Sequence, residues 1–234
     1  WHSHPFEPTE KQGFLYGRGT ADMKGSLAAM ITACENYLDN HSPDGSIAFL
    51  ITSDEEGPAV DGTRKVMQWL NQQETRIDYC VVGEPSSLNT FGDMVKIGRR
   101  GSLNGSVTIK GVQGHVAYPD VALNPIHAAI PALSELVNTK WDNGNEAFPP
   151  TTFQISNVTA GTGAVNVIPE KIHVQFNFRF SPELDAETIK RRCTDVFLKH
   201  AVDYDVEWTL SGNPFYTMPG KLTDVVSAAV NAVT

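Results

Sequence analysis

Hydrophobic residues in the first third of the chain follow two different spacings. Apolar side chains recur every three or four positions over residues 25–38 and 63–70, which predicts two helices. Residues 47–51 and 79–82 are continuous apolar runs, and a short extended run lies at 13–16. Continuous apolar strands separated by helices are typical of parallel sheets buried on both faces. The pattern therefore predicts an α/β fold with a mostly parallel sheet and helices on both of its faces.

The pattern changes after residue 96. Every second residue is apolar over 172–180, as in a strand with one buried face. The predicted elements then follow the order β-α-β-β-α-β, with strands at 103–109, 152–156, 172–180 and 204–210 and helices at 124–137 and 186–199. This order is the split βαβ arrangement, a small α+β unit of one sheet and two helices. Glycine-rich joints near 98–101 and 212–214 bound this unit, so we expect an inserted domain.

The expected domain organisation has three segments. Residues 1–97 form the first part of the α/β domain, residues 98–213 form the inserted domain, and residues 214–234 return to the first. Apolar positions at helical spacing continue to residue 233, and the chain begins without methionine. We therefore expect a fragment in which the first domain is incomplete.

Charge and hydropathy narrow the class of protein. The chain has 18 Lys and Arg against 27 Asp and Glu, a net charge of -9, and no basic run, which argues against a nucleic-acid partner. No apolar run approaches the roughly 20 residues that span a bilayer, and the start lacks the features of a signal peptide. Cys34, Cys80 and Cys193 lie far apart in apolar-patterned segments, so we expect buried thiols of a reducing compartment. These features predict a soluble cytoplasmic protein.

Three acidic clusters lie near the predicted strand ends. Glu55 and Glu56 follow the run 47–51, Glu84 follows the run 79–82, and Asp22 lies between an extended run and a helix. The carboxyl ends of parallel strands share one edge of a sheet, so these side chains should converge. Taken singly, each is better explained as a solvated loop acid or helix cap, and Asp54 or Asp61 could cap the helix that begins near residue 63.

Converging carboxylates need protons or cations to neutralise them. A divalent metal site explains all of them at once, with one carboxylate bridging two ions and Glu55 and Glu56 divided between base and ligand. Two such ions would activate water and polarise a carbonyl group, so hydrolysis of an acyl bond is the predicted chemistry. No Gly-x-Ser-x-Gly elbow or HExxH helix is present. Carboxylates alone would also suit magnesium.

The histidines divide into two kinds. His2 and His4 lie in a polar, proline-flanked loop, and a solvated pair explains them better than a metal site does. His115 lies in a glycine-rich turn of the inserted domain, where a side chain can reach a ligand. A plain loop histidine explains His115 equally well on this ground alone.

Several motifs of the chain resemble the zinc-dependent aminoacylase and carboxypeptidase family. The motifs are Tyr16-Gly17-Arg18-Gly19, Asp22-Met23-Lys24-Gly25, Ser53-Asp54-Glu55-Glu56-Gly57 and Gly83-Glu84-Pro85. Residues 96–102, 113–119, 148–151, 166–169 and 176–180 are similar to a branch of that family that removes succinyl groups from a dicarboxylic amide substrate. The similarity extends over essentially the whole chain.

The resemblance implies a role for each candidate residue. Asp22 would bridge two zinc ions, for which cobalt or manganese could substitute, Glu84 would bind one ion and Glu56 the other. Glu55 would be the general base. His115 would be delivered across a homodimer interface by the inserted domain and would stabilise the oxyanion in the partner's site. The groups that would hold the substrate carboxylates are Arg99, Ser102, Tyr118, Asn166 and Arg179.

Two zinc ligands of the family are missing from the chain, and other functions stay open. The family's Gly-His-x-Asp motif and a downstream zinc histidine lie outside the chain, so we expect this polypeptide to bind zinc weakly and hydrolyse little. An acetylornithine deacetylase or another aminoacylase would share the metal carboxylates but need fewer anion-binding groups. A truncated module whose role is dimerisation is the alternative outside the enzyme class. Arg99 and Arg100 could also be surface charges at a strand end.

Overall fold

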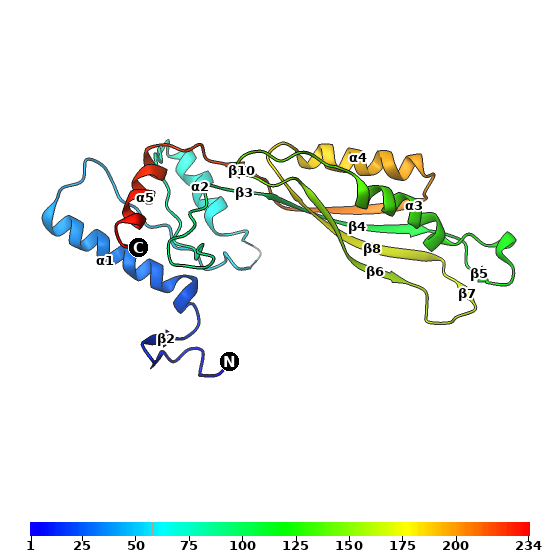
Figure 1. The fold of residues 1–234 in the computed structure, drawn as a ribbon, viewed down its shortest axis with the longest axis horizontal. Helices are drawn as coiled ribbons and strands as arrows, with labels where there is room; N and C mark the ends of the chain where they lie inside the picture. The colour runs from blue at the N-terminus through cyan, green and yellow to red at the C-terminus, as the bar shows by residue number, and fades with distance from the viewer. Residues whose placement is uncertain (58) are drawn as a thin grey trace. The chain divides into compact units, whose positions relative to one another are not determined.

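The computed structural model describes residues 1–57 and 59–234. The chain forms two compact units, unit 1 from Trp1–Val95 with Lys221–Thr234 and unit 2 from Lys96–Gly220 (Figure 1). The sequence places the corresponding boundaries at 97/98 and 213/214, whereas the units divide at 95/96 and 220/221. The roles assigned to these segments stay predictions.

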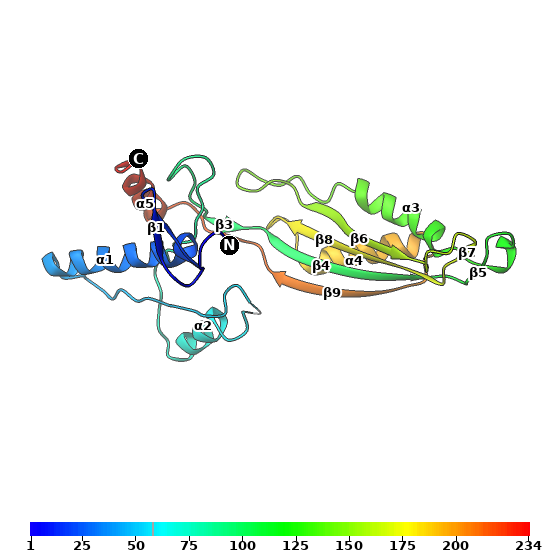
Figure 2. The same cartoon turned by 90° about the horizontal axis from the view of Figure 1, so that it is seen from below.

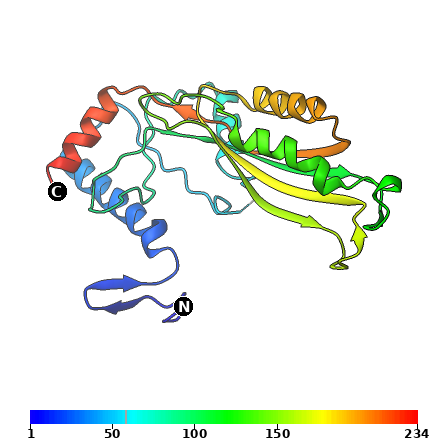
Figure 3. The same ribbon diagram turned by 45° about the vertical axis from the view of Figure 1, so that its right-hand side comes forward.

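Unit 2 is built on a four-stranded antiparallel sheet with the strand order β6-β8-β4-β9. The strands are Gly101–Lys110 (β4), Thr152–Ala160 (β6), Lys171–Phe180 (β8) and Tyr204–Gly212 (β9). The helices Pro125–Asn138 (α3) and Ala186–Lys199 (α4) lie over one face of this sheet (Figure 3). Asn124 and Asp185 cap these helices by accepting backbone N–H hydrogen bonds from Ile126 and Thr188.

The helix-covered face carries the core of unit 2. Burial alternates along β8, where the apolar residues from Ile172 to Phe180 are buried and the residues between them are not. They pack with apolar side chains from β4, α3 and α4, all at most 1% exposed: Leu103, Val107, Ala129, Leu136, Ile189 and Phe197. Burying one large apolar side chain contributes about 1.5–3 kcal/mol, so this cluster is the main source of the stability of unit 2.

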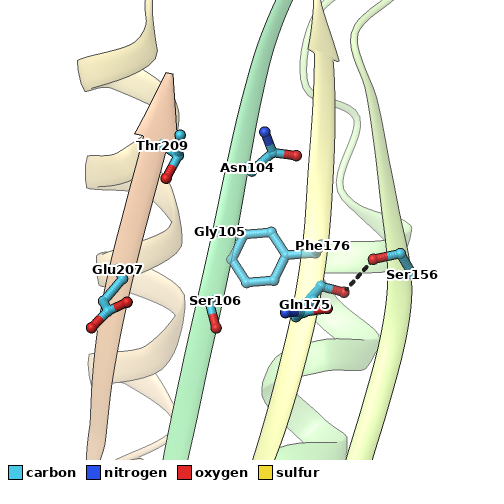
Figure 4. A pocket seen from close by; sticks show the side chains of 8 residues that line it. All are labelled: Asn104, Gly105, Ser106, Ser156, Gln175, Phe176, Glu207 and Thr209. Atoms are coloured by element: carbon cyan, nitrogen blue, oxygen red, sulfur yellow. Dashed lines mark hydrogen bonds between the residues drawn. The ribbon is translucent and has the colours of Figure 1, made fainter. Parts of the chain in front are cut away.

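The other face of the sheet is polar. Asn104, Ser106, Gln175 and Glu207 line a shallow hollow across the four strands, with the helices behind them (Figure 4). The hydroxyl of Ser156 donates a hydrogen bond to the backbone carbonyl of Gln175 over 3.2 Å. The period-two pattern therefore separates an apolar face from a polar one, as in most antiparallel sheets with one covered side.

Two short strand pairs lie at opposite ends of the sheet. Gly98–Arg99 (β3) pairs with Phe215–Tyr216 (β10) next to the start of β4. Gly114–His115 (β5) pairs with Val167–Ile168 (β7) beyond the end of β4. Figure 2 shows β3 at one end of unit 2 and the β5–β7 pair at the other. The ten residues of β4 therefore separate them.

The loop between α3 and β6 folds around one carboxylate. Asp142 accepts hydrogen bonds from the backbone N–H groups of Gly144 (2.8 Å) and Thr151 (2.9 Å) and from the hydroxyls of Thr151 and Ser181. Burial raises the pKa of Asp142, but these hydrogen bonds outweigh burial and leave the pKa below its ordinary value. The same loop packs Phe148, 8% exposed, against the β3–β10 pair.

Unit 1 contains one strand pair and several helices among its described residues. The elements are Thr9–Lys11 (β1), Phe14–Tyr16 (β2), a helical turn at Thr20–Lys24, and the helices Gly25–Asn40 (α1), Thr63–Gln72 (α2) and Lys221–Asn231 (α5). The three helices confirm the helical spacing seen in the sequence. The β1–β2 hairpin turns at Gln12 and Gly13, whose φ angles of 54° and 79° suit a two-residue turn. In the described part of the chain, no helix is both long and apolar enough to cross a membrane.

The expected parallel sheet is wrong for the residues that the structure describes. Residues 47–51 and 79–82 have no strand partner there, and all the strand pairs found are antiparallel. Ile51 is 68% exposed and Val82 is 67% exposed. Apolar and β-branched runs favour extended backbone, but a strand also needs a neighbour to complete its hydrogen bonds. The coarser assignment of an α/β protein holds.

The cysteines differ from one another in burial. Cys193 is buried in the core of unit 2, where burial raises its pKa to about 12. Cys34 is half-buried and Cys80 is exposed. The expectation of three buried thiols is therefore wrong for Cys80, because it lies in the exposed run 79–82.

Replacing Asp142 by Ala removes the shared acceptor of the α3–β6 loop. We expect unit 2 to lose about 2–4 kcal/mol of unfolding free energy, because several donors lose a charged partner. Urea unfolding followed by tryptophan fluorescence measures the loss. Asp205→Ala is the matched control, since it removes only the exposed ion pair with Lys110 and should cost at most about 1 kcal/mol.

The stability that Asp142 contributes should fall at low pH. The pKa of Asp142 is lowered in the folded protein, so its contribution is present above the unfolded value of about 3.9 and is lost as pH falls below it. The difference in stability between the wild type and Asp142→Ala should therefore shrink between about pH 4 and pH 2. A difference that stays constant over this range would contradict the assignment.

Candidate functional site

Asp22 lies in the helical turn that leads into α1. The turn starts after Gly19, whose φ of 80° is in the left-handed region. The backbone N–H of Lys24 donates to the carbonyl of Gly19 over 2.8 Å and closes the turn. Gly25 follows directly, and a Cβ atom there would lie 2.7 Å from the carbonyl oxygen of Thr20. The glycines of this motif thus allow the tight turn that positions Asp22.

Glu84 lies beside Asp22 because the preceding residue packs closely on α1. A Cβ atom on Gly83 would lie 2.9 Å from the Met30 methyl and 3.0 Å from Cβ of Ser26. The pKa of Glu84 is raised, first by a hydrogen bond with Asp22, then by burial, and then by the negative charges of Asp22, Glu55 and Glu56. The expected convergence of the acidic clusters is present in unit 1.

Glu55 and Glu56 occupy a turn that Asp54 shapes. The carboxylate of Asp54 accepts a hydrogen bond from the backbone N–H of Val60 over 3.1 Å, and its carbonyl accepts one from Gly57 over 3.3 Å. Neither Asp54 nor Asp61 caps α2, because Gly62 is the N-cap residue and no side chain bonds there. Asp61 forms an ion pair with Lys65 instead. The capping alternative for these two acids is therefore wrong.

The four acids form a pair with two near neighbours rather than a closed cage. In the described ranges, no three His, Cys, Asp or Glu side chains are arranged to hold a metal ion. Asp22 and Glu84 are within hydrogen-bonding reach, while Glu55 and Glu56 are near enough for their negative charges to raise the pKa of Glu84. Carboxylate oxygens bind hard and borderline divalent cations, and such a cation would relieve this repulsion. The assignment of Asp22, Glu56 and Glu84 as metal ligands therefore stays a prediction.

His2 and His4 lie in an exposed stretch at the start of the chain. Both side chains are exposed, and the ring of His4 makes an edge contact with Phe6 at a centroid distance of 6.3 Å.

A cationic group lies at the start of β4 in unit 2. Ser102 on β4 pairs in register with Arg179 on β8 and with Gly212 on β9. The guanidinium of Arg99 lies over Gly212, where any Cβ atom would collide with it. Among the described residues, neither Arg99 nor Arg179 forms an ion pair. Two free guanidinium groups around a hydroxyl suit a carboxylate ligand.

Asn177 belongs to this group, although the sequence did not single it out. Its side-chain amide donates to the hydroxyl of Ser102 over 3.2 Å and to the side-chain oxygen of Asn104 over 2.8 Å. It therefore fixes the orientation of the Ser102 hydroxyl. The available signal was its place two residues before Arg179, on the same face of the predicted strand.

A second polar group lies at the other end of the sheet. His115 is the last residue of β5 and Asn166 directly precedes β7, with Nδ2 of Asn166 3.5 Å from Nε2 of His115. The ring of Tyr118 lies 5.8 Å from the His115 ring. The structure therefore brings His115, Tyr118 and Asn166 together.

The two polar groups of unit 2 are far apart within one chain. Lys110 lies eight positions after Ser102 on β4, which corresponds to about 27 Å at 3.4 Å per position. His115 lies beyond that end. One small ligand therefore cannot contact Arg179 and His115 of the same chain.

Comparisons with known proteins find sequence similarity over the whole chain. A family model described as a peptidase dimerisation domain matches residues 97–205. Succinyl-diaminopimelate desuccinylase of Alkalilimnicola ehrlichii is 58% identical over 100% of the chain, and that of Leptothrix cholodnii is 56% identical over 100%. The chain spans 62% of the length of each of these relatives. The resemblance seen in the motifs is confirmed.

Solved structures show a related fold. An M20 family metallo-carboxypeptidase of Sulfolobus solfataricus superposes with a TM-score of 0.77 at 16% identity, covering 100% of this chain and 65% of its own. A tripeptidase of Staphylococcus aureus superposes with a TM-score of 0.72 at 23% identity, covering 97% and 60%. These likenesses concern the fold alone.

Replacing Glu84 by Gln tests the repulsion among the acids. Because the pKa of Glu84 is raised on folding, its favourable contribution is complete below the unfolded value of about 4.3 and is lost as pH rises through the folded value. In chelator, Glu84→Gln should unfold at a higher temperature than the wild type at pH 7, and the difference should disappear near pH 4. Glu35→Gln, on an exposed position of α1, should show no such difference. Equal melting temperatures at pH 7 would contradict the repulsion.

Proposed function

We propose that this chain, which is similar over its full length to succinyl-diaminopimelate desuccinylases and carries a peptidase dimerisation domain, serves as part of a two-zinc amide hydrolase. The reaction is the release of succinate from N-succinyl-L,L-2,6-diaminopimelate in lysine and diaminopimelate biosynthesis, in the cytoplasm. The observation that carries the proposal is the Asp22–Glu84 pair beside Glu55 and Glu56.

The acidic cluster supplies the metal ligands and the base. Asp22, Glu56 and Glu84 would hold the two zinc ions, for which cobalt or manganese could substitute. The bound ions would lower the pKa of water toward neutrality and polarise the amide carbonyl. Glu55 takes the proton from the attacking water and passes it to the leaving amine. The negative charges around Glu84 favour a bound cation. This supports the assignment, because the proposed reaction needs a divalent cation as its cofactor.

The arginines of unit 2 hold the substrate carboxylates. Arg99 and Arg179 lie on either side of Ser102, without competing ion pairs among the described residues. The substrate is a polyanion and the protein has a net charge of -9, so fixed guanidinium groups are needed to bind it. Asn177 supports the same group through Ser102.

The polar group of His115, Tyr118 and Asn166 serves in the active site of a second copy of the chain. About 27 Å of β4 separates Ser102 from Lys110, and His115 lies still further on. A homodimer formed through unit 2 allows His115, Tyr118 and Asn166 of one copy to reach a substrate held by the arginines of the other. His115 there stabilises the oxyanion of the tetrahedral intermediate.

The activity assay tests the proposed function directly. Zinc-dependent succinate release is measured with this chain and with a version extended to the length of its curated relatives, with acetylornithine as the competing substrate. Glu55→Gln should lower kcat by about 10²–10⁴ because the base is lost, whereas Glu35→Gln should leave it unchanged. Preferential deacetylation of acetylornithine would overturn the substrate assignment. Lack of both activities in both versions would overturn the enzyme assignment.

Mixing two inactive variants tests the shared site. Glu55→Gln and His115→Ala each disable one half of a composite site. If the halves come from different copies, equimolar mixing with subunit exchange should restore about a quarter of the wild-type kcat, since half of the dimers are mixed and each has one intact site. A mixture no more active than its separate components would place His115 in its own chain's site.

A further inference from the structure

His115 lies in a tight turn whose backbone folds back onto its ring. The backbone N–H of Ala117 donates a hydrogen bond to Nδ1 of His115 over 3.1 Å. The N–H of Tyr118 donates to the carbonyl of His115 over 2.9 Å, and the N–H of Val116 donates to the carbonyl of Asn166 over 3.1 Å. The ring therefore has a fixed orientation, with Nδ1 toward its own backbone and Nε2 toward Asn166.

Only one protonation form of His115 satisfies this turn. A backbone N–H can only donate, so Nδ1 must offer its lone pair to Ala117. Neutral imidazole carries a single N–H, and that proton must therefore lie on Nε2. The Nδ1–H tautomer and the imidazolium ion would each place two N–H groups against one another.

Asn166 then provides a second donor beside the first. Its Nδ2 atom lies 3.5 Å from Nε2 of His115, and with hydrogen on both atoms neither can accept from the other. The Ala117 bond at 3.1 Å is the shorter of the two contacts, while 3.5 Å lies outside the usual range of N–H hydrogen bonds, so Ala117 decides the tautomer. Both side chains are exposed. Two adjacent neutral donors suit one shared acceptor oxygen with negative charge.

We propose that the peptide N–H of Ala117 is a positioning group that holds His115 as the Nε2–H tautomer, so that Nε2 and Nδ2 of Asn166 donate together to one anionic oxygen. The tautomer follows from the geometry of the turn alone. The identity of the oxygen, that of the tetrahedral intermediate of amide hydrolysis, rests on the proposed function. The side chain of Ala117 takes no part, so ordinary side-chain substitution at 117 would miss this role.

The tautomer is measured in the metal-free, substrate-free protein. Long-range proton–nitrogen NMR of the ¹⁵N-histidine-labelled chain, at about pH 8 where imidazole is neutral, separates the protonated from the unprotonated ring nitrogen. The signals of His115 are identified by their loss in His115→Gln. The expected result is an unprotonated Nδ1 and a protonated Nε2. A protonated Nδ1 would overturn the proposal, whatever the enzyme hydrolyses.

Replacing single peptide N–H groups by ester oxygens tests the cause. Lactic acid in place of Ala117 removes the donor and sets an oxygen against the Nδ1 lone pair, so the tautomer population should shift toward Nδ1–H by about fivefold. The matched control is lactic acid in place of Ala122, whose N–H in the same loop donates to Pro119 over 3.2 Å and not to His115. The control should keep the wild-type spectrum. An unchanged His115 spectrum in the Ala117 ester would overturn the positioning role.

Kinetics with the same esters separate the two proposals. In the extended active protein, the Ala117 ester should lower kcat about threefold to tenfold with little change in KM, because the donors act on the transition state rather than on the bound substrate. The Ala122 ester should leave both values unchanged. A tautomer shift with an unchanged kcat would overturn the two-donor role of His115 and Asn166 while leaving amide hydrolysis intact. Absence of hydrolysis in the wild type would count against the proposed function alone.

Discussion

The length of β4 is the constraint on which the functional arrangement of unit 2 depends. This inner strand pairs with β8 and β9 over almost all of its ten residues, so the distance between its ends cannot change without breaking two ladders. One end carries Arg99 and Ser102, and the other leads into the turn that holds His115. Because this strand is rigid, the two polar groups at its ends cannot meet around one small ligand in a single chain. A site shared between two copies would use both groups.

In unit 1, the constraint is the close approach of the acidic side chains. Gly19 and Gly83 allow close backbone approaches that bring Asp22 and Glu84 together, and the pKa of Glu84 is raised there by the hydrogen bond with Asp22, by burial and by the neighbouring negative charges. Backbone geometry that forces like charges together is typical of sites rather than of stability. In the proposed function, the cations that neutralise these charges also perform the chemistry.

The sequence predicted unit 2 better than unit 1 for physical reasons. The strict alternation from Ile172 to Phe180 has one solution, a strand with its apolar side on a core, and α3 and α4 supply that core. The apolar runs at 47–51 and 79–82 indicate extended backbone, but only pairing partners make a sheet, and runs alone do not specify partners. The prediction of a buried thiol at Cys80 is wrong for the same reason, because Cys80 lies in the run 79–82. The convergence of Asp22 and Glu84 was predictable from their motifs, whereas the Ala117 bond to His115 depends on a backbone turn that side-chain patterns do not encode.

The most direct test of this account is a crystal structure of the extended protein with zinc and succinate, in which anomalous scattering locates the metal ions. The account predicts zinc at Asp22, Glu56 and Glu84, succinate on Arg99 or Arg179, and His115 of a second copy with Nε2 directed at the same site. Zinc bound away from Asp22 and Glu84, or His115 directed at the site of its own chain, would contradict it.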